Sequence, residues 1–212
     1  MRRVSMTTAE AVKLQEKLRG RVIKKTTFKN PSTVGGVDVS VKDGISRAAV
    51  AVLTYPGQEL VNTVTASRPT EFPYVPGLLA FREIPVILDA FEKLTDVPDF
   101  LIVDGQGYAH PRRFGVACHL GVELDIPAIG CAKSRLIGEY EEPGVKRGAR
   151  SALYYEKEVI GSVVRTRDGV KPVFISIGHR VDLDTAVSLA LGCVTRYRLP
   201  EPVREAHKAA GL

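Results

Sequence analysis

The sequence predicts an α/β fold in which a mixed sheet, made of an antiparallel meander and parallel strands, is flanked by helices. The meander follows from three strand-like runs, at 33–41, 46–55 and 60–67, separated only by short turn segments. The parallel strands follow from a strand–helix–strand succession over 99–131, because connected parallel strands need a crossover. With 212 residues, 44% of them hydrophobic, the chain can bury the core of one domain, which we expect to span residues 1–212.

The first expected element is an amphipathic helix over residues 7–19, within a lead-in that extends to residue 30. Thr7 or Thr8 is a suitable N-cap, and Gly20 is a suitable stop. The apolar anchors of this helix are Val12, Leu14 and Leu18. After the meander, residues 78–94 carry a broad apolar helical face, and Pro85 inside it predicts a kink or a restart.

The second half alternates strands and helices. In the strand–helix–strand unit we expect a strand at 99–104, a helix at 112–124 and a strand at 126–131. Residues 138–150 are rich in glycine and charge, which is typical of a surface loop. The remaining expected elements are strands at 152–165 and 172–177, a helix at 182–195 that Asp182 caps, and a short tail from Pro200.

Composition narrows the class of protein. Thirty Lys and Arg residues against 24 Asp and Glu residues give a formal net charge of +6, which suits a phosphate-rich partner. The three cysteines are widely spaced and lie in apolar runs, so they predict neither a disulfide framework nor a zinc cluster. No apolar run reaches the ~18 residues of a membrane span, and no secretory leader follows Met1. We therefore expect a soluble cytoplasmic protein, monomeric and without a membrane partner.

Three acids in apolar settings are the strongest functional signal. Asp38 lies in TVGGVDVSV, Glu83 in LLAFREIPVIL and Asp104 in DFLIVDGQG. An ionised acid among apolar residues is costly unless it is paired, hydrogen-bonded or bound to a metal. On the strand around Asp38 a valine face alternates with a small polar face, which leaves room for an ion. Oxygen ligands of this kind suit Mg²⁺, for which Mn²⁺ can substitute.

Each candidate functional residue could instead have a purely structural role. Asp104 could cap the turn that follows its strand, and Glu83 could be an exposed helix acid. Tyr74 could pack over a loop, and Lys133 could be a solvated loop lysine. His110 could be a loop histidine with a structural role. His179, just before a helix, is expected to be structural.

Long motifs resemble those of the endonuclease V family of deoxyinosine 3′ endonucleases. They are VGGVDVS, RPTEFPYVPGLLAFRE, LIVDGQGYAHPRRFGVACHLG, IGCAKSRLIG and EPVREAH, and together they span about residues 33–207. The resemblance implies an RNase H-like fold. It also implies Mg²⁺-dependent hydrolysis of the second phosphodiester bond 3′ to deoxyinosine in single- or double-stranded DNA, leaving 3′-hydroxyl and 5′-phosphate ends. Inosine-containing RNA is an additional candidate substrate.

The resemblance also implies roles for individual residues. Asp38, Glu83 and Asp104 match the catalytic, metal-binding acids, with Lys133 at the scissile phosphate and His207 as a further active-site residue. Tyr74 matches the wedge that separates the strands, and proline on both sides of the PYVP tip stiffens its backbone. The displaced base is expected in a pocket formed by Gly77, Leu79, Gly105, Gly107, His110, Gly115, Ala132 and Leu136.

Other functions are kept as alternatives. One is a different RNase H-like nuclease, such as an excision nuclease resembling the UvrC C-terminal half or a junction resolvase. Another is a non-catalytic protein that binds inosine or nucleic acid. Contacts with the nucleic-acid backbone are expected from Lys24, Lys25, Arg68, Arg112, Arg113, Arg135, Lys146, Arg147 and Arg150.

Overall fold

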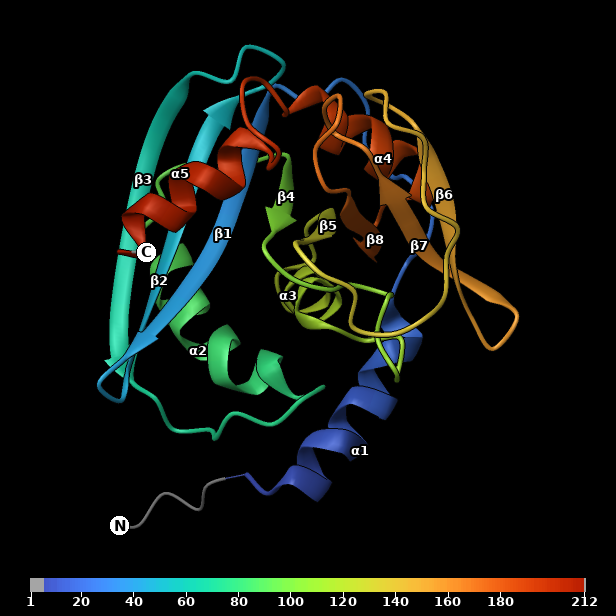
Figure 1. Cartoon of the computed structure of the whole chain (residues 1–212). Coiled ribbons are helices and arrows are strands. Elements are labelled where there is room, and N and C mark those ends of the chain that lie inside the picture. The colour runs from blue at the N-terminus through green and yellow to red at the C-terminus, as the bar shows by residue number, and fades with distance from the viewer. Residues whose placement is uncertain (1–5, 212) are drawn as a thin grey trace, which may run out of the picture.

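A single mixed sheet of eight strands organises the molecule (Figure 1). The computed structural model describes residues 6–211. Across the sheet the strands run in the order β3-β2-β1-β4-β5-β8-β7-β6. Their bounds are β1 Thr33–Lys42, β2 Ile45–Thr54, β3 Leu60–Pro69, β4 Phe100–Val103, β5 Ala128–Ala132, β6 Arg150–Tyr155, β7 Glu158–Val164 and β8 Val173–His179.

The predicted strand pairing is confirmed. Strands β1, β2 and β3 pair antiparallel as a meander, while β1, β4 and β5 pair parallel. In the β1–β4 register Val37 lies opposite Val103, so the next residues, Asp38 and Asp104, emerge side by side from neighbouring strands. The backbone N–H of Asp104 donates to the Val37 carbonyl at 3.0 Å, which fixes this alignment where β4 ends.

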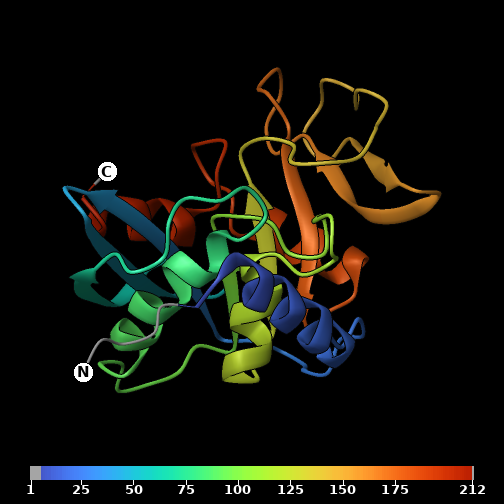
Figure 2. The ribbon, with the colours of Figure 1, turned by 90° about the horizontal axis from the view of Figure 1, so that it is seen from below.

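Helices cover both faces of the sheet (Figure 2). Helices α2 (Leu79–Phe91) and α3 (Val116–Leu124) pack on one face, and α4 (Leu183–Gly192) and α5 (Glu201–Ala209) pack on the other. In Figure 2 the red α5 and the green α2 lie on opposite sides of the meander strands. Pro85 lies inside α2, which continues through it without a restart.

The first helix, α1 (Thr8–Leu18), is confirmed where the sequence predicts it, and a short 3-10 helix at Arg19–Arg21 follows it. Thr7 and Glu10 form a reciprocal capping box at its start. Leu18 packs against Phe114 and Cys118 at the start of α3. The buried stripe of α1 consists of Ala11, Gln15 and Leu18, so a glutamine occupies one of the positions where an apolar residue is expected.

Three elements differ from the prediction. The expected strand at 152–165 is a hairpin of β6 and β7, because Glu156 and Lys157 both take positive φ and turn the chain. The expected tail contains the helix α5. Helix α3 begins at Val116 rather than at residue 112, after an irregular loop.

Two exclusions based on composition can be compared with the structure. Cys118, Cys131 and Cys193 are buried free thiols, as predicted. Over the described residues 6–211, none of the helices has the length and apolar character to cross a bilayer.

His179 is buried and its Nδ1 accepts the N–H of Ile23 at 3.3 Å, which confirms a structural contact.

Candidate active site

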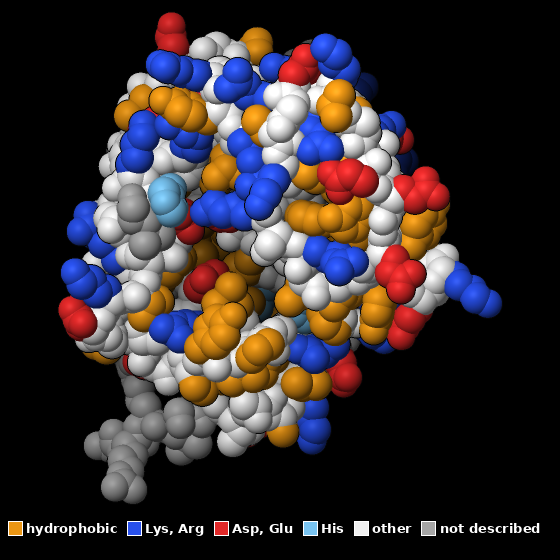
Figure 3. Space-filling model, viewed as in Figure 1, with side chains coloured by type: hydrophobic (Ala, Val, Ile, Leu, Met, Phe, Trp, Pro, Cys, Tyr) orange, Lys and Arg blue, Asp and Glu red, His pale blue; other side chains and the backbone are white. Residues whose placement is uncertain are grey.

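Asp38 and Asp104 form the centre of an acidic cluster. Together with His207 they each offer one ligand atom, and these atoms lie within 4.8 Å of one another. The parallel register of β1 and β4 brings the two acids together, and α5 supplies the histidine. The space-filling view shows acidic side chains at the floor of a hollow with Lys and Arg side chains along its upper rim (Figure 3).

His207 reaches the cluster because α5 lies directly on β1. A Cβ on Gly36 would come within 1.9 Å of the Pro202 carbonyl oxygen, so only glycine permits this approach. From there α5 carries the His207 Nδ1 to 2.7 Å from one Asp38 carboxylate oxygen. The Ser40 hydroxyl donates to the Ala210 carbonyl at 2.7 Å and secures the end of the helix. The small polar face of β1, which we expected to leave room for an ion, therefore mainly receives α5.

Glu83 approaches the two acids from α2. Burial and, after it, the charges of Asp38 and Asp104 raise the pKa of Glu83 to about 8, while Arg82 opposes the shift. Its carboxylate lies outside the three-residue group of candidate ligands. The cluster therefore contains an acid that holds its proton at neutral pH until a positive charge arrives.

Lys133 closes the other side of the cluster. It follows β5, and its Nζ lies 2.5 Å from an Asp104 carboxylate oxygen. Burial raises the pKa of Asp104, the hydrogen bond from Lys133 lowers it, and the charge of Asp38 raises it. With its side chain 41% exposed, Lys133 borders both the buried acid and the open hollow.

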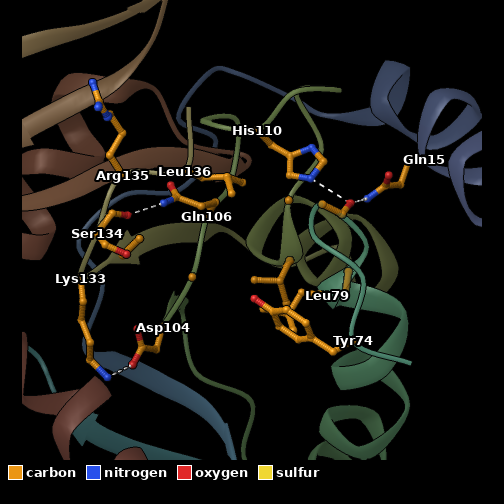
Figure 4. Close-up of a pocket in the computed structure, with 16 residues that line it drawn as sticks. Gln15, Tyr74, Leu79, Asp104, Gln106, His110, Lys133, Ser134, Arg135 and Leu136 are labelled. Atoms are coloured by element: carbon orange, nitrogen blue, oxygen red, sulfur yellow. Dashed lines mark hydrogen bonds and ion pairs between the residues drawn. The ribbon is translucent and has the colours of Figure 1, made fainter. Parts of the chain in front are cut away.

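A cavity of about 310 Å³ adjoins the cluster (Figure 4). Asp104 lines it, as do Lys133, Gln15, Gln106, Ser134 and Arg135. Eight of the nine predicted base-binding residues line it too: Tyr74, Gly77, Leu79, Gly105, His110, Gly115, Ala132 and Leu136. The ninth, Gly107, lies against β8, where its N–H donates to the Ser176 hydroxyl at 2.9 Å and an added Cβ would meet the Ile177 carbonyl.

Tyr74 stands at the mouth of this cavity. Its side chain is 69% exposed, and Figure 4 places its ring beside Leu79. A large exposed aromatic ring on a proline-flanked tip is free to stack with a base. Among the predicted wedge and pocket residues, Tyr74 is the one that projects furthest toward solvent.

His110 supports the cavity wall from behind. Its Nδ1 accepts the Arg112 backbone N–H at 3.2 Å, so its Nε2 carries the hydrogen that is donated to the Gly77 carbonyl at 3.0 Å. Burial lowers the pKa of His110 to about 4, and the charge of Arg112 contributes. The imidazole is therefore neutral at neutral pH.

Sequence reasoning missed three polar residues of the cavity, Gln15, Gln106 and Ser134. Gln106 donates through Nε2 to the Ser134 carbonyl at 2.9 Å, which ties the loop after β4 to the loop after β5. Gln15 comes from α1, outside the motif strings. Its signal was the glutamine at the apolar i+4 position between Ala11 and Leu18.

Several basic residues that we expected to face nucleic acid make internal contacts. Arg113 bonds to Glu158 at 2.8 Å, and Arg68 bonds to Asp89 at 3.2 Å. Arg112 faces the protein interior, where its Nε donates to the Gln15 side-chain oxygen at 2.5 Å. Lys133 and Arg135 line the cavity itself.

Comparison with known proteins identifies the family. The family model described as Endonuclease V matches residues 16–208. The chain belongs to the Endonuclease V family. This membership confirms the predicted class of enzyme, a DNA-repair endonuclease specific for deoxyinosine, and with it the RNase H-like fold.

Individual relatives agree over nearly the whole chain. The Endonuclease V of Trichormus variabilis is 53% identical over 97% of this chain and 94% of its own length. The crystal structure of the Streptomyces avermitilis Endonuclease V has a TM-score of 0.93 at 45% identity, covering 97% of this chain and 92% of that one. The Ciona intestinalis Endonuclease V, crystallised with a 23mer DNA containing an inosine followed by a ribo-adenosine, has a TM-score of 0.86 at 32% identity, with 97% of each chain covered.

Proposed function

We propose that this Endonuclease V seats a displaced hypoxanthine base in the 310 Å³ cavity and cleaves the second phosphodiester bond on its 3′ side at the acidic cluster. One observation carries the proposal: Asp104 both lines the cavity and belongs to the candidate ligand group. Base recognition and hydrolysis are thereby joined through one residue. DNA containing deoxyinosine is the proposed partner of a cytoplasmic monomer, and the products carry 3′-hydroxyl and 5′-phosphate ends.

The donor set fits Mg²⁺. Hard carboxylate oxygens converge there. Burial first, and then the charge of neighbouring acids, raises the pKa values of Glu83 and Asp104, so a bound cation would stabilise their ionised forms. Asp38 and Asp104 would hold the ion directly, with His207 beside them and Glu83 acting through water or on a second ion. Mg²⁺, or Mn²⁺ in its place, supplies polarisation of the phosphate and an attacking water of lowered pKa.

The remaining residues act on the phosphate and on protons. The Lys133 ammonium is proposed to leave Asp104 and neutralise charge that develops on the scissile phosphate. The His207 Nδ1 orients the Asp38 carboxylate, which leaves Nε2 on the partly exposed side of the ring to hold or relay a proton.

The cavity suits hypoxanthine through shape and backbone groups. Hypoxanthine offers an O6 acceptor and an N1–H donor, unlike adenine, and it lacks the 2-amino group of guanine. Gly77, Gly105 and Gly115 let backbone groups approach a flat ring, while Tyr74 fills the gap that the base leaves in the stack. We expect the seated base to have no space beside its C2, which would reject guanine.

Inosine-containing RNA is a second candidate substrate. The relative from Ciona intestinalis was crystallised with an inosine followed by a ribo-adenosine, so that protein accepts a 2′-hydroxyl directly after the lesion. Cleavage of matched oligonucleotides with deoxyribose or ribose on the 3′ side would rank the two substrates.

The test uses a labelled oligonucleotide with a single deoxyinosine. We expect one nick on its 3′ side with Mg²⁺, and none with EDTA, with an adenine control or with Asp38→Asn. Asp43→Asn is the matched control, because Asp43 lies exposed in the turn after β1 and should leave cleavage unchanged. Binding without a nick would point to a recognition protein, and nicking regardless of inosine would point to a general nuclease.

A further inference from the structure

The Gly77 carbonyl accepts hydrogen bonds from three different side chains. The donors are Gln15 Nε2 at 3.0 Å, His110 Nε2 at 3.0 Å and Arg112 Nη2 at 2.7 Å. A carbonyl oxygen has two lone pairs, so three donors hold this peptide more firmly than satisfying it would require. In Figure 4 the dashed lines from His110 and Gln15 meet on this one oxygen.

Gln15 links three segments: its own helix α1, the Gly77 turn, and the loop that contains Arg112 and Phe114. Its Nε2 also donates to the Phe114 carbonyl at 3.2 Å, and its side-chain oxygen accepts from Arg112 Nε at 2.5 Å. The side chain is 1% exposed, and a buried amide is costly unless it is bonded in this way. An apolar residue at the same position of the stripe would dock α1 equally well but could not hold Gly77.

The peptide held by Gln15 is the hinge between the wedge and the cavity wall. Gly77 has a φ of +77°, directly after the PYVP tip and two residues before α2 begins at Leu79. No side chain caps this start of α2, and the first N–H groups of a helix have no acceptor within it. Leu79 and Ala80 line the cavity, and the Gly77 peptide leads directly into their backbone, so holding the Gly77 carbonyl helps to fix where this part of the cavity wall lies.

We propose that Gln15 is a positioning residue for base recognition. By holding the Gly77 carbonyl, it fixes the backbone that reads the displaced base and thereby sets the preference for hypoxanthine over adenine. This inference rests on the proposed function of the cavity. The family match begins at residue 16, so Gln15 lies just outside the matched part of the chain.

The experiment compares Gln15→Met with wild-type protein. Methionine keeps the size and helix propensity of glutamine but removes both donated hydrogen bonds and the acceptor for Arg112. Dissociation constants are measured in EDTA for two oligonucleotides that differ only in one deoxyinosine or deoxyadenosine. We expect the dissociation constant for the deoxyadenosine oligonucleotide, divided by that for the deoxyinosine oligonucleotide, to fall about tenfold. This is the factor expected when one hydrogen bond to the base is lost.

Two further variants separate positioning from folding. Leu18→Ala is the control for stability, and its melting temperature is compared with that of Gln15→Met. It weakens the docking of α1 without removing a hydrogen bond to Gly77, so it should leave the ratio unchanged. Gln15→Glu keeps an acceptor for Arg112 but points oxygen at the Gly77 and Phe114 carbonyls, so it should lower the ratio at least as much as Gln15→Met.

The inference is overturned if Gln15→Met keeps the wild-type ratio, or if Leu18→Ala lowers the ratio equally. It is also overturned if Gln15→Met weakens binding of both oligonucleotides alike. A wild-type protein that binds the two oligonucleotides equally would overturn the proposed function itself, and that result is visible before any variant is compared.

Discussion

Glu83 illustrates how an acid beside a proposed metal site can cost stability. An acid whose folded pKa is raised from 4.5 to about 8 binds its proton more tightly in the folded state. Its cost to stability therefore appears as the pH rises above 4.5 and keeps growing up to about 8, where the folded group finally ionises. A buried, ionised Glu83 therefore destabilises the metal-free fold.

We expect Glu83→Gln to raise the melting temperature in EDTA, by more at pH 8.5 than at pH 5, because glutamine has no charge to be buried or to repel Asp38 and Asp104. Thermal unfolding at the two pH values measures the difference. Glu92→Gln, at the exposed end of α2, is the control and should change little at either pH. An equal gain at both pH values would contradict the electrostatic explanation.

The pKa shift of His110 changes stability with pH in the opposite direction to that of Glu83. Its folded pKa is lowered from 6.5 to about 4, so the unfolded chain binds the proton first as the pH falls. The stability that His110 contributes is present above pH 6.5 and is lost progressively down to pH 4. We expect acidification from pH 7 to pH 5 to cost about 2 kcal/mol at this site.

Denaturant unfolding of His110→Gln at both pH values tests this estimate, because glutamine can replace the donor to Gly77 without titrating. The variant should lose less stability than wild-type protein over the same interval. A titration of the His110 ring followed by NMR with a midpoint near 6.5 would refute the assignment.

At the scale of elements, the contact between α5 and β1 controls the cluster. Gly36→Ala would drive a Cβ to 1.9 Å from the Pro202 carbonyl oxygen, and a backbone atom cannot swing aside as a side-chain end can. We expect about 1–3 kcal/mol of destabilisation and a larger loss of cleavage than of DNA binding, because His207 moves away from Asp38.

Gly20→Ala is the control, since an added Cβ there meets nothing within 4 Å. Its unfolding free energy should stay within about 0.5 kcal/mol of wild type. Normal cleavage by Gly36→Ala would show that α5 can shift without consequence.

The elements also mark what could be predicted from sequence. Periodicity located the meander, α2 and the parallel β4 and β5, because their apolar patterns are long and regular. The hairpin β6–β7 was read as one strand because its turn residues, Glu156 and Lys157, are not typical turn formers. Helix α5 was missed because it is short and polar and gains its stability by docking on Gly36.

The candidate site was predictable to a similar degree. Asp38 and Asp104 were identified from unfavourable apolar surroundings, while Lys133, Tyr74 and His207 depended on motif resemblance. The sequence could not predict which residues meet, because this depends on the pairing register of β1 and β4, in which Val37 lies opposite Val103. Gln15 was overlooked because a polar residue in a helix ordinarily faces water, and its partner Gly77 lies 62 residues away.

At the scale of the molecule, part of the positive charge is paired with acids. Arg113, Arg68, Arg150 and Lys146 each pair with an acid, so the count of 30 Lys and Arg residues overstates the number of cations that are free to contact DNA. DNA binding should weaken with salt, with a slope set by the few cations near the hollow.

We expect Lys133→Met to reduce that salt slope by about 0.7–0.9, the value for one phosphate contact. Lys157→Met, at the exposed turn of the β6–β7 hairpin, should leave the slope unchanged. Titrations of deoxyinosine DNA over a range of salt concentrations measure both. Equal slopes for wild type and Lys133→Met would remove Lys133 from the phosphate contacts.

The close approach of Pro202 to Gly36 has a consequence for biosynthesis. Strand β1 leaves the ribosome early and α5 is the last helix in chain order, yet Asp38 and His207, 169 residues apart, must meet to complete the cluster. Nascent chains, and chains clipped by a protease between β8 and α5, hold the acids but lack the histidine. If His207 serves in cleavage as proposed, we expect a chain to become a competent nuclease only after α5 has been made and has docked on β1.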